Sequence, residues 1–224
     1  MTGTMDDIMI IPAAGRGSRL ASELPKVLFP VLGRPMLDYL LERYAPHVGA
    51  FAVVVHPSFR AEVERYCVGR SETIAFAVQE EPTGMLDAIL MPLEQVGVRD
   101  ARRIWITWCD QVAVRVETAA ALAAQGGDPA LVLPTVRRPE PYIHFARDAV
   151  GNIVDVLHRR EGDEMPDEGE SDIGVFVLSR AAYCELLPEF SRSVATGSLT
   201  AERNFLPFIP WLQRRAKIRT VLAC

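Results

Sequence analysis

The chain has few cysteines, no surplus of basic residues and no long apolar run, and each absence excludes a class of protein. Its 4 cysteines contain no C-x-x-C pair, which disfavours a thiol redox motif or a zinc knuckle. Asp and Glu number 29 against 24 Lys and Arg, for a net charge of −5, so the basic footprint of a nucleic-acid-binding protein is missing. We therefore expect buried, reduced cysteines and no polynucleotide partner.

The apolar run nearest the N-terminus, Ile8–Ala14, is too short to cross a membrane. Asp6 and Asp7 stand in front of it, where a signal peptide would carry basic residues. These features predict a cytoplasmic protein with no membrane partner.

Composition places the chain among ordinary globular proteins. Hydrophobic residues make up 49% and charged residues 24%, which excludes disordered, collagen-like and disulfide-scaffold classes. A length of 224 residues fits one large domain. We expect a single domain over 1–224.

Short β-rich runs alternate with helical stretches through the first half, which predicts a parallel sheet covered by helices. The expected strands are Ile8–Pro12, Ala50–Val55, Thr73–Val78, Arg103–Trp108 and Ala130–Leu133. The expected helices are Met36–Tyr44, Phe59–Val68, Met85–Val96 and Val116–Ala124. Because the strands are apolar nearly throughout, both faces of the sheet should be covered. The predicted fold class is α/β, doubly wound, mostly parallel and Rossmann-like.

The second half begins with a different pattern. Tyr142–Arg147 and Ile153–Leu157 predict an inserted β-hairpin, and the acidic stretch Arg159–Ser171 is expected to be a mobile loop or lid. The remaining expectations are a strand at Ile173–Leu178, a helix at Ala181–Leu187, a loop at Ser191–Ser198, a helix at Asn204–Arg214 and a strand at Ile218–Leu222.

Small and basic residues follow the first strand: Ala13, Ala14, Gly15, Arg16, Gly17, Ser18 and Arg19, with Pro25–Lys26 shortly after. Such a loop lets phosphates approach backbone N–H groups and cations. A dinucleotide fingerprint fails because position 20 is leucine, and a P-loop fails because the chain has no Gly-Lys pair. From these residues alone, a phosphate site and an ordinary turn both remain open.

The string from Ala13 to Arg19, with Leu24–Lys26 and Gly33–Met36, strongly resembles the signature of the sugar-phosphate nucleotidyltransferases. It is most similar to UDP-N-acetylglucosamine pyrophosphorylase domains and to glucose-1-phosphate thymidylyltransferases. The resemblance implies that the residues from Ala13 to Ser18 wrap a nucleotide, and that Arg19 and Lys26 hold phosphates with Arg16 beside them.

Gln79 to Ala88 follows the third expected strand, at an edge where α/β proteins bind ligands. The glutamine amide offers both a donor and an acceptor, as pairing with a uracil or thymine edge requires. The string resembles the family's Q-x-x-P-x-G pattern, which implies that Gln79, Pro82 and Gly84 bind the nucleotide. An ordinary exposed amide is the alternative.

Asp110 follows the fourth expected strand. The family usually carries Gly-Asp at this point and binds Mg²⁺ through the aspartate, so the resemblance implies a catalytic, metal-binding Asp110, with Cys109 in place of the glycine. Hard oxygen ligands suit Mg²⁺. The alternative is a helix cap.

The segment Glu170–Val177 resembles the family's acid–x–Asn–Thr–Gly stretch that contacts the sugar. Asp172 stands in place of the asparagine, followed by Gly174, and His144 lies where relatives present a glycine-containing turn. These three residues are the expected acceptor-binding set. His144 is equally consistent with a structural hydrogen bond.

The resemblance implies transfer of a nucleoside monophosphate from an NTP, UTP or dTTP, to a sugar-1-phosphate with release of pyrophosphate. It also implies that residues 1–135 form a nucleotide-binding half and residues 136–224 an acceptor-binding half of the single domain. It also implies a second Mg²⁺ ligand after the last strand, whereas the chain stops at Cys224; truncation, a ligand from elsewhere and weakened catalysis stay open. The competing hypotheses are a cytidylyl- or molybdopterin-guanylyltransferase with another acceptor, and a non-catalytic sensor of sugar nucleotides.

Overall fold

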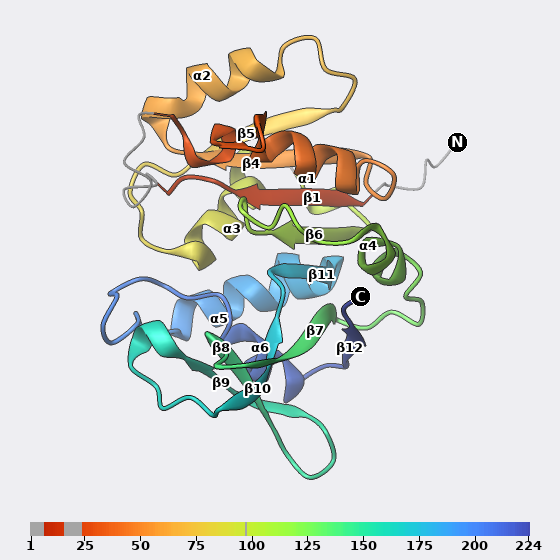
Figure 1. The fold of residues 1–224 in the computed structure, drawn as a ribbon, viewed down its shortest axis with the longest axis vertical. Helices are drawn as coiled ribbons and strands as arrows, with labels where there is room; N and C mark the ends of the chain where they lie inside the picture. Colours follow the sequence, from red (N-terminus) through yellow and green to blue (C-terminus); the bar gives the residue numbers. More distant parts are fainter. Residues whose placement is uncertain (1–6, 16–23, 97) are drawn as a thin grey trace.

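The computed structural model describes residues 7–15, 24–96 and 98–224. Eight strands form one sheet in the order β10–β7–β11–β6–β1–β4–β5, with β12 paired to β7. Their bounds are Ile8–Pro12 (β1), Ala50–Val55 (β4), Ile74–Val78 (β5), Arg103–Thr107 (β6), Leu131–Pro139 (β7), Glu168–Asp172 (β10), Val175–Ser179 (β11) and Ile218–Leu222 (β12). The sheet runs through both halves of the chain (Figure 1).

The first-half strands that belong to the main sheet are parallel to one another. β1 lies between β4 and β6, with Ile10 opposite Ala52 on one side and Ile106 on the other, and β5 extends the same ladder. β11 runs antiparallel between β6 and β7, and β10 runs antiparallel on β7. The mostly parallel α/β fold expected from the sequence is confirmed, with antiparallel insertions in its second half.

Helices cover both faces of the sheet. The first group is α1 (Met36–Tyr44), α2 (Pro57–Cys67) and α4 (Val116–Ala123), and the second is α3 (Met85–Gln95), α5 (Leu187–Ser193) and α6 (Phe208–Gln213). Consecutive strand residues point to opposite faces, so Met9 and Ile11 join the core of the first group while Ile10 joins that of the second. This two-sided burial explains why the strands are apolar nearly throughout.

Two small hairpins stand outside the main sheet. The first is β2 (Pro30–Val31) with β3 (Arg34–Pro35), and the second is β8 (Ile143–Arg147) with β9 (Ile153–His158). The inserted hairpin expected in the second half is therefore confirmed. It lies next to β10 at the far end of the sheet (Figure 1) and buries Ile143, Phe145 and Ile153 against the α3–α5–α6 core.

The expected lid at Arg159–Ser171 is wrong in part. Residues Arg159–Glu161 form a 3₁₀ turn, and Glu168–Asp172 is strand β10. The acidic composition of this stretch is not typical of a strand, so the sequence did not predict β10. A bidentate ion pair supports the pairing of β10 with β7: Arg147 Nε and Nη2 each lie 2.7 Å from a carboxylate oxygen of Glu170.

Two helix boundaries also differ from expectation. A π-helical turn at Ala182–Leu186 leads directly into α5, so the helical segment reaches Ser193, beyond the expected end at Leu187. The helix expected from Asn204 begins only at Phe208, because the backbone of the preceding Arg203 is hydrogen-bonded to Thr83 and Leu86.

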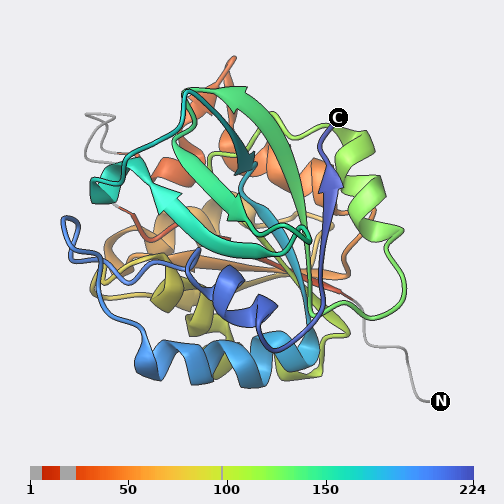
Figure 2. The same cartoon turned by 90° about the horizontal axis from the view of Figure 1, so that it is seen from below.

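Seen from below, β12 ends beside α4, and the chain terminus lies next to that helix (Figure 2). The backbone N–H of Cys224 donates to Thr118 Oγ1 at 3.0 Å. None of the described helices has the length and apolarity needed to cross a bilayer.

Candidate nucleotide and acceptor site

The carboxyl ends of β1, β4, β5 and β6 lie at one edge of the sheet because these strands are parallel. The turn that precedes β11 reaches the same edge, since β11 is antiparallel and Val175 pairs with Thr107. The loop after β1, the segment after β5, the turn after β6 and the turn before β11 therefore meet there, as in α/β proteins that bind ligands beyond their strand ends.

Lys26 and Asp110 are brought together across 84 positions of sequence. Buried Val27 and Leu28 anchor the short 3₁₀ helix that carries Lys26, and Asp110 stands just past the end of β6. Lys26 Nζ lies 2.6 Å from Asp110 Oδ2, and the two side chains remain 31% and 40% exposed. A ligand arriving from solvent can therefore reach both charges.

The first loop is described only at its beginning. Ala13 and Ala14 are buried, with the Ala13 N–H donating to Val54 O at 2.7 Å, whereas Gly15 is exposed and has open space where a side chain would stand. The backbone at Gly15 can thus be approached closely by a ligand. The predicted phosphate-handling residues Arg16, Gly17, Ser18 and Arg19 lie outside the described residues.

Gln79 is not an exposed amide: its side chain is only 5% exposed. Its Nε2 donates to Gly84 O at 3.2 Å and to Thr83 Oγ1 at 3.4 Å. Both amide hydrogens are therefore used inside the segment, while no described residue donates to the Gln79 carbonyl. Pro82 is exposed. Gly84, at φ +131, is required by close contact, because a Cβ there would lie 2.5 Å from the Arg203 carbonyl oxygen.

The turn before β11 presents Asp172 and Gly174. Asp172 Oδ1 accepts a hydrogen bond from the Gly174 N–H at 2.7 Å, and burial raises the pKa of the Asp172 carboxyl. Gly174 has φ +71, and a Cβ would lie 2.5 Å from Trp108 Cδ1, so glycine alone lets this turn sit against the end of β6.

His144 makes a structural hydrogen bond, because its Nδ1 accepts from the Glu170 N–H at 3.2 Å and ties β8 to β10. It is not among the residues that line the cavity, whereas its neighbours Tyr142 and Ile143 are. The predicted role of His144 in acceptor binding thus has no geometric support in the described residues.

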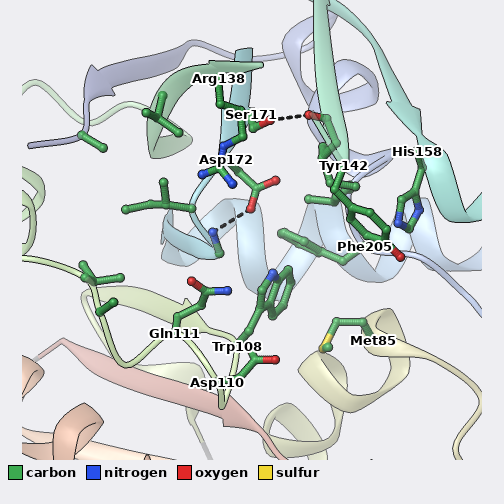
Figure 3. Close-up of a pocket in the computed structure, with 18 of the residues that line it drawn as sticks. Met85, Trp108, Asp110, Gln111, Arg138, Tyr142, His158, Ser171, Asp172 and Phe205 are labelled. Carbon is green, nitrogen blue, oxygen red and sulfur yellow. Dashed lines mark hydrogen bonds between the residues drawn. The ribbon is translucent and has the colours of Figure 1, made fainter. Parts of the chain in front are cut away.

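A cavity of about 690 Å³ opens beside Asp110, Asp172 and Gly174. Figure 3 shows Asp172 and Arg138 at one side, Trp108 and Gln111 opposite, and Tyr142, His158 and Phe205 at the other end. Trp108 packs against Phe176 and Phe205 with ring centroids 5.2 and 6.1 Å apart. The cavity therefore combines a polar end and an aromatic wall.

Sequence reasoning missed several of these cavity residues. Trp108 and Gln111 flank Asp110, so their position in that strand-end turn was an available signal. Arg138, His158 and Phe205 come from β7, β9 and the loop before α6, and no motif marks them. Burial lowers the pKa of His158, so this imidazole is neutral near pH 7 and can both donate and accept hydrogen bonds.

Cys109, the residue before Asp110, does not have the environment of a reactive cysteine. It is buried, and burial raises its pKa to about 11, so it remains a protonated thiol near neutral pH.

The residues present fit a magnesium ion held mainly by its substrate. No group of three or more His, Cys, Asp or Glu capable of holding a metal occurs among the described residues. Asp110 supplies one accessible carboxylate, which matches the usual Mg²⁺ arrangement of one or two carboxylates completed by phosphates and water.

Known proteins resemble this chain in sequence and in fold, and the similarities in sequence to curated relatives come first. Bifunctional protein GlmU of Cupriavidus metallidurans is 34% identical over 158 residues, which cover 70% of this chain and 34% of that protein. GlmU of Stenotrophomonas maltophilia is 29% identical over 190 residues, covering 84% and 41% respectively. The chain thus spans about a third to two fifths of the length of these relatives.

A solved structure, the inositol-1-phosphate CTP transferase from T. maritima, superposes with a TM-score of 0.71 over 99% of this chain and 87% of that one, at 16% identity. At this identity the likeness shows the fold. The family model described as MobA-like NTP transferase domain matches residues 9–170, and the resemblance to nucleotidyltransferases is confirmed. The chain belongs to the MobA-like NTP transferase domain family, whose members are nucleotidyltransferases.

Proposed function

We propose that this protein transfers a nucleoside monophosphate from a nucleoside triphosphate to a sugar-1-phosphate, with release of pyrophosphate. The observation that carries the proposal is the Lys26–Asp110 pair, 2.6 Å apart with both side chains partly exposed, in which Asp110 also lines the cavity of about 690 Å³. A cation for phosphates and a carboxylate for a divalent ion stand where both substrates would meet.

In the proposed reaction an oxygen of the acceptor phosphate attacks the α-phosphorus in line. The bond from the α-phosphorus to the bridging oxygen breaks, and pyrophosphate leaves with that electron pair. No proton has to be removed, because the acceptor phosphate is already ionised near neutral pH. The protein's contribution is therefore positioning and neutralisation of charge.

Lys26 changes partner in this scheme. Without substrate its ammonium neutralises Asp110. On binding of the triphosphate, the flexible lysine stem can turn the ammonium to the phosphates. Asp110 is the residue that would hold Mg²⁺, and the ion would supply further neutralisation of phosphate charge. Arg19 and Arg16 are proposed to join Lys26 at the phosphates.

The cavity is proposed to hold the acceptor. Its volume of about 690 Å³ lies within the usual range for small-ligand pockets. Asp172, Arg138 and His158 offer hydrogen bonds to hydroxyl groups, while Trp108 and Phe205 provide an aromatic surface for the apolar face of a sugar ring. Asp172 stands where the resembling family has asparagine, so a carboxylate, and not an amide, is proposed to accept hydrogen bonds from the sugar hydroxyl groups.

The base is proposed to be uracil or thymine. Because both amide hydrogens of Gln79 are engaged within its own segment, its carbonyl is the group left to meet a base. That carbonyl can accept from the imide N–H of uracil or thymine, whereas the corresponding ring nitrogen of cytosine is itself an acceptor. UTP or dTTP should therefore be preferred over CTP.

The test is pyrophosphate release with UTP, dTTP, CTP, ATP and GTP, each combined with a panel of sugar-1-phosphates and with inositol-1-phosphate, in the presence of Mg²⁺. CTP and inositol-1-phosphate are included because the structural neighbour from T. maritima is an inositol-1-phosphate CTP transferase. Nucleotide binding without pyrophosphate release for every acceptor would support the sensor hypothesis instead.

The base proposal has its own variant. Replacing Gln79 with glutamate removes the N–H₂ donor that holds Gly84 O and should change the ranking of the five triphosphates by kcat/KM, with a loss for the preferred one of roughly 1–3 kcal/mol, or about 5- to 150-fold. An unchanged ranking would show that Gln79 does not act on the base.

A further inference from the structure

A single surface segment, residues 197–205, connects the two sides of the proposed site; we name it the strap. The strap leads toward α6 and lacks regular secondary structure. Two backbone hydrogen bonds within it hold its shape: the Gly197 N–H donates to Glu202 O at 2.8 Å, and the Ala201 N–H donates to Gly197 O at 3.0 Å. Its residues Glu202, Asn204 and Phe205 line the cavity.

On the nucleotide side the strap is fastened through Arg203. Its N–H donates to Thr83 O at 2.8 Å, and its carbonyl accepts from the Leu86 N–H at 3.0 Å. Its guanidinium forms an ion pair with Asp87 and hydrogen bonds with the Ser191 carbonyl and Oγ. The side chains of Arg203 and Asp87 are only 27% and 14% exposed, so the contact is shielded from most of the solvent.

Gly84 links the contacts of Arg203 to the side chain of Gln79. Gly84 lies between Thr83 and the start of α3, so close to the Arg203 backbone that no Cβ fits. The carbonyl of Gly84 accepts from Gln79 Nε2 at 3.2 Å. Gly84 is therefore held between Arg203 on one side and Gln79 on the other, and a shift of Arg203 would change where the Gln79 amide lies.

On the acceptor side the strap is fastened separately. Arg160 makes two hydrogen bonds to Glu202, at 2.8 and 3.0 Å. The Glu161 carboxylate accepts from Thr200 Oγ1 at 2.5 Å and from Asn204 Nδ2 at 3.0 Å. The acceptor-side contacts are made by other side chains of the strap than Arg203, so a substitution at Glu202 removes one of them and leaves the contacts of Arg203 in place.

We infer that Arg203 is a positioning residue for base selection: it holds Gly84, and through Gly84 the amide of Gln79, against the incoming base. The inference rests on the proposed function, because it assigns Arg203 to the nucleotide side of the same site. Arg203 contacts Thr83, Leu86, Asp87 and Ser191, and it acts on the base only through Gly84 and Gln79. Its substitution reduces the preference for one nucleotide over the other.

The test compares dissociation constants for UTP and CTP with Mg²⁺, by titration calorimetry on the whole chain, so that no turnover is required. Arg203→Met should raise the dissociation constant of the preferred nucleotide about 10-fold and narrow the preference between the two. Arg203→Lys, which keeps a cation opposite Asp87, should recover most of the preference. Asp87→Asn should act in the same direction as Arg203→Met, about 3-fold.

Two controls separate positioning from a general loss of stability. Arg192→Met removes an exposed arginine of α5 that has no hydrogen bond or ion pair with any described side chain, and should change neither constant. Glu202→Gln removes the carboxylate that pairs with Arg160 on the acceptor side of the strap and should leave the nucleotide preference unchanged. Melting temperatures of all variants are recorded in parallel.

The inference is overturned if Arg203→Met weakens UTP and CTP equally, if it lowers the melting temperature alone, or if Glu202→Gln narrows the preference as much. Should Arg203→Met fail to fold, the same criteria apply to Asp87→Asn, with Arg203→Lys as the variant that keeps the preference. A wild type that ranks nucleotides but releases no pyrophosphate would refute only the proposed function. A wild type that binds no nucleotide would refute both.

Discussion

Replacement of Asp110 by asparagine separates a catalytic role from a structural one, because it removes the charge and preserves the shape. Asp110 lies 2.6 Å from Lys26 Nζ with 40% of its side chain exposed. The two roles predict different magnitudes for stability and for rate.

The effect on stability should be small. In a water-like dielectric two unit charges 2.6 Å apart attract by about 1.6 kcal/mol, and side-chain entropy and desolvation reduce the net value of exposed pairs to about 0.2–1 kcal/mol. For a chain of this size, 1 kcal/mol corresponds to a change in Tm of about 2–4 °C. We therefore expect a Tm within a few degrees of the wild type.

The effect on rate should be large. Loss of a metal-anchoring charge costs several kcal/mol in the transition state, and about 4 kcal/mol corresponds to about 10³-fold in kcat. The assay is Mg²⁺-dependent pyrophosphate release, with differential scanning calorimetry on the same preparation. An Asp110→Asn protein that keeps more than about a tenth of the activity, or that melts far below the wild type, would refute the assignment.

Three further predictions concern individual residues of the site and the strap. Gly174→Ala should destabilise the protein by about 2–4 kcal/mol in urea unfolding, since it combines φ +71 with a clash against the indole ring; Gly151→Ala, at φ +91 with open space around it, should cost only the backbone part. Hydrogen bonds hold the pKa of Glu161 at about 2, against an ordinary 4.5, so its stabilising contribution is complete above about pH 4.5 and is lost as the pH falls through about 2; the Tm difference between wild type and Glu161→Gln should shrink over that window, and a constant difference would contradict it. Cys109, buried with a pKa raised to about 11, should resist N-ethylmaleimide at pH 8 while the exposed C-terminal cysteine reacts, as peptide mass spectrometry can show.

Local pattern was sufficient for much of the first half of the fold. The expected helix Met36–Tyr44 matches α1, and the expected strands Ile8–Pro12 and Ala50–Val55 match β1 and β4. Hydrophobic periodicity and Pro35 before the helix are local signals, and two-sided burial of the strands leaves apolar residues at nearly every position. Asp110 could also be picked out from the sequence, because it stands in the turn after the apolar strand β6.

Other features depended on which distant segments pair. The stretch Glu168–Asp172 is polar and acidic, and only its ladder to β7 and the ion pair of Glu170 with Arg147 make it a strand. Likewise, the periodicity of Asn204 and its neighbours predicts a helix. In the structure, however, the backbone of Arg203 is hydrogen-bonded to Thr83 and Leu86, more than a hundred residues earlier in the chain. No local signal carries such information.

The sequence by itself determined the α/β class, the order of the elements in the first half, and the residue types placed at the strand ends, since these follow from periodicity and from motifs of adjacent residues. Only the tertiary structure decided that Lys26 pairs with Asp110, that Gln79 is buried with both amide hydrogens engaged, that His144 holds β10, and that Arg203 closes against Gly84. The physical reason is that these contacts join segments far apart in the chain, and their geometry is set by how the sheet and its covering helices pack.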